Sequence, residues 1–409
     1  MQTINKADRQ ILRDLAKNQL EYANSDRNKE VIRRWYKLNA GDSTTPLIHL
    51  EIGTFMSEVI PHRLCCEGDK ARQIEYSFYR NFINHALFKD DHPVTDYYPL
   101  QKWLSLVPFN ITVERQHANS SVGHMFTHHI HDLEDDFYKL GPGRIVNNMQ
   151  ATAEEKALLE DIFGDILPVK YVQNCLYSVP TQDLVHIMSM ENMYFAIADY
   201  PELFHKMMEN YTNDVLRFYR YLEDENLLET TNEAESLGQG SWCFNTELPT
   251  TAKKTTDIWG FMDSQETVGI SPAMFKEFIF PYYKKISENY GMLSYGCCEP
   301  VHAIWDECLS TLKNLRKVSV SPWCDQQFMG ERLRGGKIVY HRKPSPNYLG
   351  VDINLDEPQL RSHIKETLLA ARGCPLEITQ RDVYTIHNNE KKAIRFIEII
   401  REEIESNWQ

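Results

Sequence analysis

Segments typical of β-strands alternate with segments typical of helices along most of the chain, and this alternation restricts the possible folds more than any other feature. Short apolar runs bounded by turn residues predict strands at 46–53, 109–114, 182–188, 292–295, 316–322, 337–343 and 376–382. Helical periodicity predicts helices at 201–221, 357–372 and 389–406. Such alternation without a long linker indicates one parallel α/β domain. With about eight strands, a closed (β/α)8 barrel of the TIM type is favoured over an open sheet.

The first 45 residues carry a different pattern. Apolar side chains between positions 8 and 39, such as Leu12, Leu15 and Trp35, are spaced mostly by three, four and their multiples among charged residues. We therefore expect a helical extension over residues 1–45 and the barrel over residues 46–409. No glycine-rich GxGxxG or P-loop motif follows a predicted strand, which argues against a nucleotide cofactor.

Charge and cysteine content exclude several classes of protein. The 409 residues include 44 Lys and Arg against 58 Asp and Glu, a formal charge of −14, and no run of five or more basic residues is present. Nucleic acids and anionic membranes are therefore not expected partners. The absence of a signal-peptide pattern and of an uncharged apolar run of about 18 residues predicts a cytoplasmic protein. The nine cysteines are too few for a disulfide scaffold and should be free thiols or metal ligands.

The stretch 292–300 joins a predicted buried strand to two thiols and a carboxylate, and reads Met-Leu-Ser-Tyr-Gly-Cys-Cys-Glu-Pro. Barrel active sites form at this end of the strands. Adjacent residues of a strand point to opposite sides, so only one of Cys297 and Cys298 should face the barrel mouth if the strand persists. If the strand has already ended, Cys298 or Glu299 is equally suitable as the residue that faces the mouth. Buried core thiols without a metal are the alternative.

Five histidines are clustered at positions 117, 124, 128, 129 and 131. Clustered histidines can bind a metal. A polar hairpin or lid is the favoured interpretation, because acidic residues follow directly at 132–136.

Three short motifs between residues 262 and 298 form a recognisable pattern. They are Met-Asp-Ser-Gln-Glu-Thr-Val-Gly-Ile-Ser-Pro-Ala-Met-Phe-Lys-Glu-Phe from 262, Pro-Tyr-Tyr-Lys-Lys from 281 and Leu-Ser-Tyr-Gly-Cys-Cys from 293. The pattern resembles the uroporphyrinogen decarboxylase superfamily, extends roughly over residues 180–405 and implies a (β/α)8 barrel. True decarboxylases of this family grip substrate carboxylates with an arginine-rich segment, whereas residues 46–55 contain no arginine. Porphyrinogen decarboxylation is therefore not expected.

The cobalamin-dependent methyltransferase branch of this superfamily fits better, with two departures. Tyr295 stands where that branch carries a zinc-binding histidine, and no cysteine falls near Arg381, where a later ligand is expected. The similar methanol:corrinoid methyltransferases hold zinc with one glutamate and two cysteines from separate strand ends. This resemblance implies zinc ligands among Glu266, Cys297, Cys298 and Cys324.

The resemblance implies a methyltransferase that moves a methyl group between a small methylated compound, such as a methyl ether, and a corrinoid protein. Zinc would activate the substrate. One alternative is a metal-independent decarboxylase or lyase of the same superfamily. Another is a non-catalytic barrel that binds a corrinoid or tetrapyrrole. Superfamily dimers also make a homodimer expected.

Other polar residues at the predicted strand ends complete the expected site. We expect acid, base or other catalytic roles for Glu51, Tyr295 and Glu299. We expect substrate binding by His49, Glu114, His341 and Lys343, of which His341 and Lys343 would suit an anionic group. A solvated basic face is the alternative for the last two.

Overall fold

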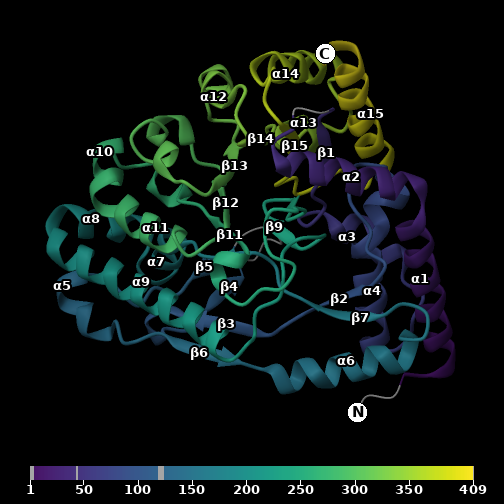
Figure 1. Ribbon diagram of the computed structural model, residues 1–409, viewed down its shortest axis with the longest axis horizontal. Coiled ribbons are helices and arrows are strands. Elements are labelled where there is room, and N and C mark those ends of the chain that lie inside the picture. Colours follow the sequence, from purple (N-terminus) through teal and green to yellow (C-terminus); the bar gives the residue numbers. More distant parts are fainter. Residues whose placement is uncertain (1–3, 43–44, 118–123, 409) are drawn as a thin grey trace.

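Seven parallel strands form the central sheet of the computed structural model, which describes residues 4–42, 45–117 and 124–408 (Figure 1). In hydrogen-bonded order they are β1 (Leu47–Leu50), β15 (Leu376–Gln380), β14 (Val339–Arg342), β13 (Leu315–Val320), β12 (Met292–Tyr295), β11 (Trp259–Met262) and β8 (Leu176–Tyr177). All neighbouring pairs are parallel. The carboxyl ends of the strands therefore lie on one edge of the sheet, where α/β folds of this kind bind ligands.

The closed eight-stranded barrel is not what the structure has. Among the described residues, β1 and β8 are the two edges of the sheet and do not pair with each other. The fold is a mixed α/β arrangement with a large parallel sheet, and it is barrel-like but open at this seam.

Two of the predicted strands are wrong, for different reasons. Residues 182–188 belong to α7 (Pro180–Met188), which has proline in its first turn and buries side chains at helical spacing, namely Leu184, Ile187 and Met188. The predicted strand at 109–114 includes Phe109 and Asn110 with φ near +53°, which extended backbone does not allow. A short apolar run such as 182–188 fits the repeat of a strand and that of a helix, so tertiary packing determines which of the two forms.

A short hairpin packs against the inner face of the sheet, opposite the covering helices. Its strands are β9 (Ser236–Gly238) and β10 (Ser241–Trp242), which are antiparallel. At its tip Gly240 has a φ of +75°, and an added Cβ would lie 2.6 Å from Cγ2 of Thr379 and 3.2 Å from Cδ2 of His49. Only glycine fits this conformation and this space. The hairpin tip therefore packs against β15 and β1 from the inside.

Helices cover the outer face of the sheet. α9 (Pro201–Asp224) packs against α11 (Phe280–Ser287), and α14 (Glu357–Ala370) packs against α15 (Glu390–Asn407), which also contacts β1. The remaining helices of this half are α8 (Met190–Asp199), α10 (Pro272–Met274), α12 (Gln326–Leu333) and α13 (Asn347–Gly350). Outward side chains of the strands, such as Ile48, Val318 and Ile378, join the helices in the main apolar core.

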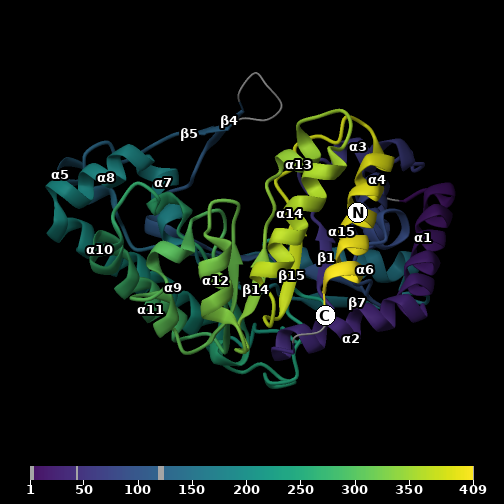
Figure 2. The ribbon, with the colours of Figure 1, turned by 90° about the horizontal axis from the view of Figure 1, so that it is seen from above.

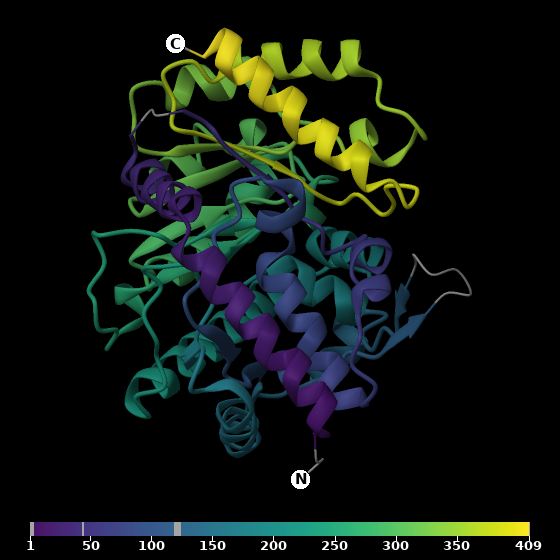
Figure 3. The same cartoon turned by 90° about the vertical axis from the view of Figure 1, so that its right-hand side faces the viewer.

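The N-terminal residues form two helices, α1 (Lys6–Asn24) and α2 (Asp26–Ala40), within the segment for which helix is predicted. α1 packs against α4 (Asp69–Ile83) and α6 (Met149–Phe163) around a second apolar core that includes Leu12, Phe78 and Phe163. Figure 3 shows the chain ends at opposite ends of the molecule. In the described part of the chain, no helix is long and apolar enough to cross a bilayer.

The residues between α4 and β8 form small strand pairs beside the main sheet. These are β2 (Tyr98–Gln101) with β7 (Val169–Val172), β3 (Leu104–Val107) with β6 (Arg144–Asn147), and β4 (Arg115–His117) with β5 (His124–Phe126). Short helices α3 (Met56–Val59) and α5 (Leu133–Asp136) complete this half. Figure 2 shows β4 and β5 extending from the body of the molecule. Of the five histidines, His117 and His124 lie in this antiparallel strand pair, in line with the predicted hairpin, whereas His128, His129 and His131 follow it; residues 118–123 lie outside the described ranges.

Candidate functional site

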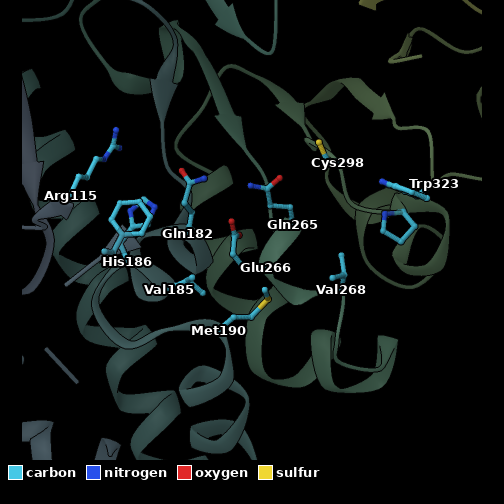
Figure 4. Close-up of a pocket in the computed structure, with 12 residues that line it drawn as sticks. Arg115, Gln182, Val185, His186, Met190, Gln265, Glu266, Val268, Cys298 and Trp323 are labelled. Atoms are coloured by element: carbon cyan, nitrogen blue, oxygen red, sulfur yellow. The ribbon is translucent and has the colours of Figure 1, made fainter. Parts of the chain in front are cut away.

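A cavity of about 960 Å³ opens beyond the carboxyl ends of β8, β11, β12 and β13 (Figure 4). It is lined by Arg115, Phe126, Gln182, Val185, His186, Met190, Gln265, Glu266, Val268, Cys298, Pro300 and Trp323. The segments that follow the four strands, including α7 and the start of α8, contribute most of these residues, and the β4–β5 hairpin contributes the first two. The volume is at the upper end of the range for small-molecule sites.

Two thiols follow the end of β12. The Sγ atoms of Cys297 and Cys298 lie 3.6 Å apart, and the Cys297 thiol donates the hydrogen bond. This hydrogen bond lowers the pKa of Cys298 and raises the pKa of Cys297. Burial raises the pKa of Cys298, and so does the charge of Asp382, whose Oδ2 lies 3.8 Å from Cys298 Sγ. The charge of Lys343 lowers this pKa. The thiol that ionises more readily is therefore the one that lines the cavity.

A buried carboxylate holds the thiol loop in place. Oε2 of Glu299 accepts the N–H of Cys297 at 2.8 Å, and its Oε1 accepts the N–H of Ser264 at 3.0 Å. Glu299 is 3% exposed. It ties the loop after β11 to the loop after β12, and so fixes the position of Cys298.

Two more carboxyl groups follow β11. Burial raises the pKa of Asp263 well above its ordinary value, and the nearby charges of Glu299 and Cys297 add to this effect. Oδ1 of Asp263 has no hydrogen-bond partner among the described residues. Burial also raises the pKa of Glu266, whose Oε2 accepts the hydroxyl of Thr181 at 2.9 Å. Both groups therefore keep a proton at a higher pH than an exposed carboxyl group does.

Two cations lie beside the thiol loop at the ends of β14 and β15. Nζ of Lys343 donates to Oε1 of Gln239 at 2.7 Å and to the carbonyl oxygen of Cys297 at 3.2 Å, and burial lowers its pKa. Nε of Arg381 lies 3.0 Å from Oε2 of Glu51. The mouth therefore combines positive charge with acids and a thiol pair within a small volume.

Buried polar side chains on β13, β14 and β15 pair with one another on the inner face of the sheet. Nζ of Lys317 donates to Oε2 of Glu377 at 2.5 Å, and both side chains are fully buried. Nε2 of His341 lies 2.8 Å from the hydroxyl of Thr379, and burial lowers the pKa of His341 well below its ordinary value. These buried groups pair with one another and do not line the cavity.

Some of the residues predicted to be functional lie at or beside the cavity, and others lie elsewhere in the structure. Glu266 and Cys298 line the cavity, while Glu51, Glu299 and Lys343 lie beside it in the same layer. His341 lies in the packed interior, and Nδ1 of His49 lies 3.0 Å from Oδ2 of Asp90 in a buried pair. Glu114 is exposed and outside the lining of the described cavities.

Tyr295 lies on the opposite face of β12 from the barrel interior. Its hydroxyl is 2.6 Å from the hydroxyl of Ser264, and its ring packs near Tyr283 in the apolar core. It is fully buried and does not line the cavity. Its position therefore suits a structural hydrogen bond.

The four predicted zinc ligands do not converge on one point. Sγ of Cys324 lies 3.6 Å from both the hydroxyl of Ser321 and the carbonyl oxygen of Glu299, and Glu266 is bound to Thr181. Across the described ranges, no group of three or more His, Cys, Asp or Glu side chains is arranged to hold a metal ion. This arrangement does not fit zinc, so we assign no step to it, and zinc binding stays a prediction.

Several residues of the mouth were missed by sequence reasoning. Asp263, Arg381 and Asp382 directly follow strands, so the rule that barrel sites form at strand ends could have indicated them. Gln239 and Arg115 come from hairpins outside the main sheet, and no local sequence signal marks them.

Comparisons with known proteins support the fold. No protein-family model matches the chain, and no curated protein matches it either. Solved structures do match. One of them, a methyltransferase from Methanosarcina mazei, is similar over 91% of this chain and 98% of its own, with a TM-score of 0.51 and 12% sequence identity. At this identity the likeness establishes a shared fold.

Proposed function

We propose that this protein is a methyltransferase that moves a methyl group between a small methylated compound, such as a methyl ether, and a corrinoid carried by a partner protein. The observation that carries the proposal is the presence of the Cys298 thiol and the Glu266 carboxyl group on the walls of one cavity at the strand ends. The shared fold with a solved methyltransferase supports it.

Glu266 is suited to act as an acid. Removal of a methyl group from an ether leaves a negative charge on the oxygen, and a proton must reach that oxygen. Burial raises the pKa of Glu266, and the hydroxyl of Thr181 fixes its orientation. The protonated carboxyl group would donate its proton to the leaving oxygen.

Cys298 is suited to favour the transfer electrostatically. A methyl group carries partial positive charge while it moves between two nucleophiles, and a fixed negative charge beside it lowers the barrier. The Cys297 hydrogen bond lowers the pKa of Cys298, and Lys343 supports this change. In its ionised form, which the lowered pKa favours, Cys298 would place this negative charge beside the methyl group.

The rim of the cavity fits a large flat cofactor. Trp323 is 73% exposed, Val268 58% and Met190 41%, although all three are apolar. Exposed apolar patches of this kind mark binding surfaces. These three residues would hold one face of a corrinoid delivered by the partner protein. A reduced corrinoid supplies the nucleophile that takes the methyl group.

The test is a methyl-transfer assay with corrinoid protein in the Co(I) state and a panel of methyl ethers, read by the absorbance change on methylation of cobalt. We expect transfer with at least one donor, and a loss of about tenfold or more in Glu266→Gln and Cys298→Ser. Cys65→Ser is the matched control, because Cys65 is exposed and does not line the cavity. No absorbance change with any donor would overturn the proposal.

A metal-independent decarboxylase or lyase is the second candidate. Lys343 and Arg381 could bind a substrate carboxylate, and Asp263, which has an unpartnered oxygen and a raised pKa, could return a proton to carbon. Release of CO2 without any corrinoid protein, lost in Asp263→Asn, would favour this function over methyl transfer.

A further inference from the structure

A separate cavity of about 380 Å³ lies between α2, α15 and the turn that follows the π-helix η2 (Asn84–Phe88). It shares no lining residue with the cavity at the strand ends. On its wall, Nη2 of Arg34 donates to the carbonyl oxygen of Pro46 at 2.8 Å, directly before β1 begins. This basic cavity therefore lies at the amino end of β1, away from the candidate functional site.

Four cationic side chains line the basic cavity, although the chain as a whole has a formal charge of −14. They are Arg27 and Arg34 on α2, Lys89 after η2, and Arg401 on α15. Burial lowers the pKa of Arg27, and the charge of Arg401 adds to this effect, so these two guanidinium groups are close enough to repel each other. Segments from three distant parts of the sequence thus bring like charges to one place.

One buried carboxylate is shared by two of the four cations. Oδ1 of Asp91 accepts from Nη1 of Arg34 at 3.0 Å and from Nη2 of Arg401 at 3.2 Å, and Asp91 is 1% exposed. Nε of Arg34 is buried and has no hydrogen-bond partner in the part of the chain that the structure describes. Asp91 therefore neutralises only part of the charge around it.

The other two cations, Arg27 and Lys89, form no ion pair within the described ranges. Arg27 donates to the carbonyl oxygens of His85 at 2.7 Å and Asp90 at 2.6 Å, and such backbone groups carry no net charge. Lys89 is exposed. Both side chains are therefore available to an anion.

Two glutamates on the walls are already paired with arginines that do not line the basic cavity. Glu30 lies 2.5 Å from Arg33, and Glu398 lies 3.3 Å from Arg395. The remaining walls are apolar, because the other lining residues are valine, phenylalanine and isoleucine side chains. An anion with a small organic group suits this combination of charge and apolar surface.

We propose that the basic cavity is a binding site for a small phosphate monoester. A phosphate group carries about two negative charges and three acceptor oxygens, so it can accept hydrogen bonds from Arg27, Lys89 and Arg401 together. A carboxylate has one charge and two oxygens and would leave one of these cations unmatched. The organic part contacts Phe88 and Ile394. The bound phosphate joins three separate segments and stabilises their packing beside β1.

Calorimetric titration at pH 8 and constant ionic strength tests the inference on the full chain. The probes are phenyl phosphate and benzenesulfonate, which has the same ring and a tetrahedral head group but only one negative charge. We expect phenyl phosphate to bind about tenfold more tightly than benzenesulfonate and to raise the melting temperature. Equal affinity for the two probes, or no binding of phenyl phosphate, would overturn the inference.

Variants place the bound phosphate. Lys89→Gln and Arg27→Gln should each weaken phenyl phosphate binding about tenfold, and Lys89→Gln removes an exposed side chain without an ion pair in the described ranges, so the fold should be retained. Lys29→Gln is the matched control, because Lys29 is exposed on α2 outside the cavity lining, and it should match the wild type. Unchanged affinity in either test variant would overturn the inference. So would a loss of affinity in Arg115→Gln, which would place the phosphate in the cavity at the strand ends.

Discussion

The Sγ atoms of Cys297 and Cys298 lie 3.6 Å apart, and of the two side chains it is Cys298 that lines the cavity. The hydrogen bond from Cys297 lowers the pKa of Cys298, so more of it is thiolate near neutral pH. We expect iodoacetamide to alkylate Cys298 faster than any buried cysteine, with a rate that rises as pH passes through its lowered pKa. Peptide mass spectrometry over a time course measures this rate.

Cys297→Ala is the informative variant for this pair, because alanine cannot donate the hydrogen bond. Its Cys298 should react roughly threefold or more slowly at neutral pH, and its rate profile should move to higher pH. Cys308→Ala removes a buried thiol of the main core and should leave the profile unchanged. An unaltered profile in Cys297→Ala would show that the hydrogen bond does not control the thiolate.

Glu235 makes stability depend on pH. It is 4% exposed, and burial raises its pKa from 4.5 to about 7. Because the folded pKa is raised, its contribution to stability is complete below pH 4.5 and is lost as pH rises through about 7. Glu235→Gln should therefore be more stable than the wild type at pH 8, by up to about 3 kcal/mol, and similar at pH 4.5. Urea unfolding of both proteins at both pH values measures the difference in the free energy of unfolding. The same pH dependence in the wild type and in Glu235→Gln would contradict the prediction.

The helices and most sheet strands could be predicted because their periodicity extends over many residues. α9, α14 and α15 lie where apolar spacing predicts helices. The open seam between β1 and β8 could not be predicted, because it depends on which segments pair across the chain. Residues 182–188 show the same limit: the apolar run suits a strand or a helix, and packing in the core selects the helix.

Site residues that directly follow strand ends could be predicted from the sequence. The side of the sheet to which a side chain points, and contacts with distant hairpins, could not. Cys298 and Glu266 occupy the cavity wall as the strand-end rule indicates. Tyr295 was expected at the mouth, but the two-residue period of β12 turns it away from the interior. Arg115 reaches the cavity from a separate hairpin, and no local pattern encodes such a long-range contact.

Tyr295→Phe tests the placement of Tyr295 directly. The variant loses the hydrogen bond to Ser264 but keeps the buried ring. We expect the unfolding free energy to fall by about 1 kcal/mol, whereas activity should change by no more than about twofold. Ser264→Ala removes the same hydrogen bond and should have a similar effect on stability. A tenfold loss of activity in a folded Tyr295→Phe protein would restore the catalytic role.

Gly240→Ala tests whether the hairpin tip fits the interior as described. An alanine Cβ would lie 2.6 Å from Cγ2 of Thr379, in a backbone conformation with φ of +75°. Gly335 has a similar φ of +72° with no atom within 4 Å of an added Cβ, so Gly335→Ala isolates the cost of conformation alone. We expect Gly335→Ala to lower the free energy of unfolding by about 1 kcal/mol. Gly240→Ala should cost a further 1–3 kcal/mol or so, because Thr379 must move.

The steric effect at Gly240 should also reach the mouth. Gln239 precedes it and accepts the hydrogen bond from Nζ of Lys343 at 2.7 Å, so displacement of the tip removes a partner from a buried cation. Gly240→Ala should therefore lower activity as well as the melting temperature, whereas Gly335→Ala should lower only the melting temperature. Equal stability of the two variants would mean that the tip does not pack against β15. Full activity in Gly240→Ala would mean that Lys343 does not depend on Gln239 for its position.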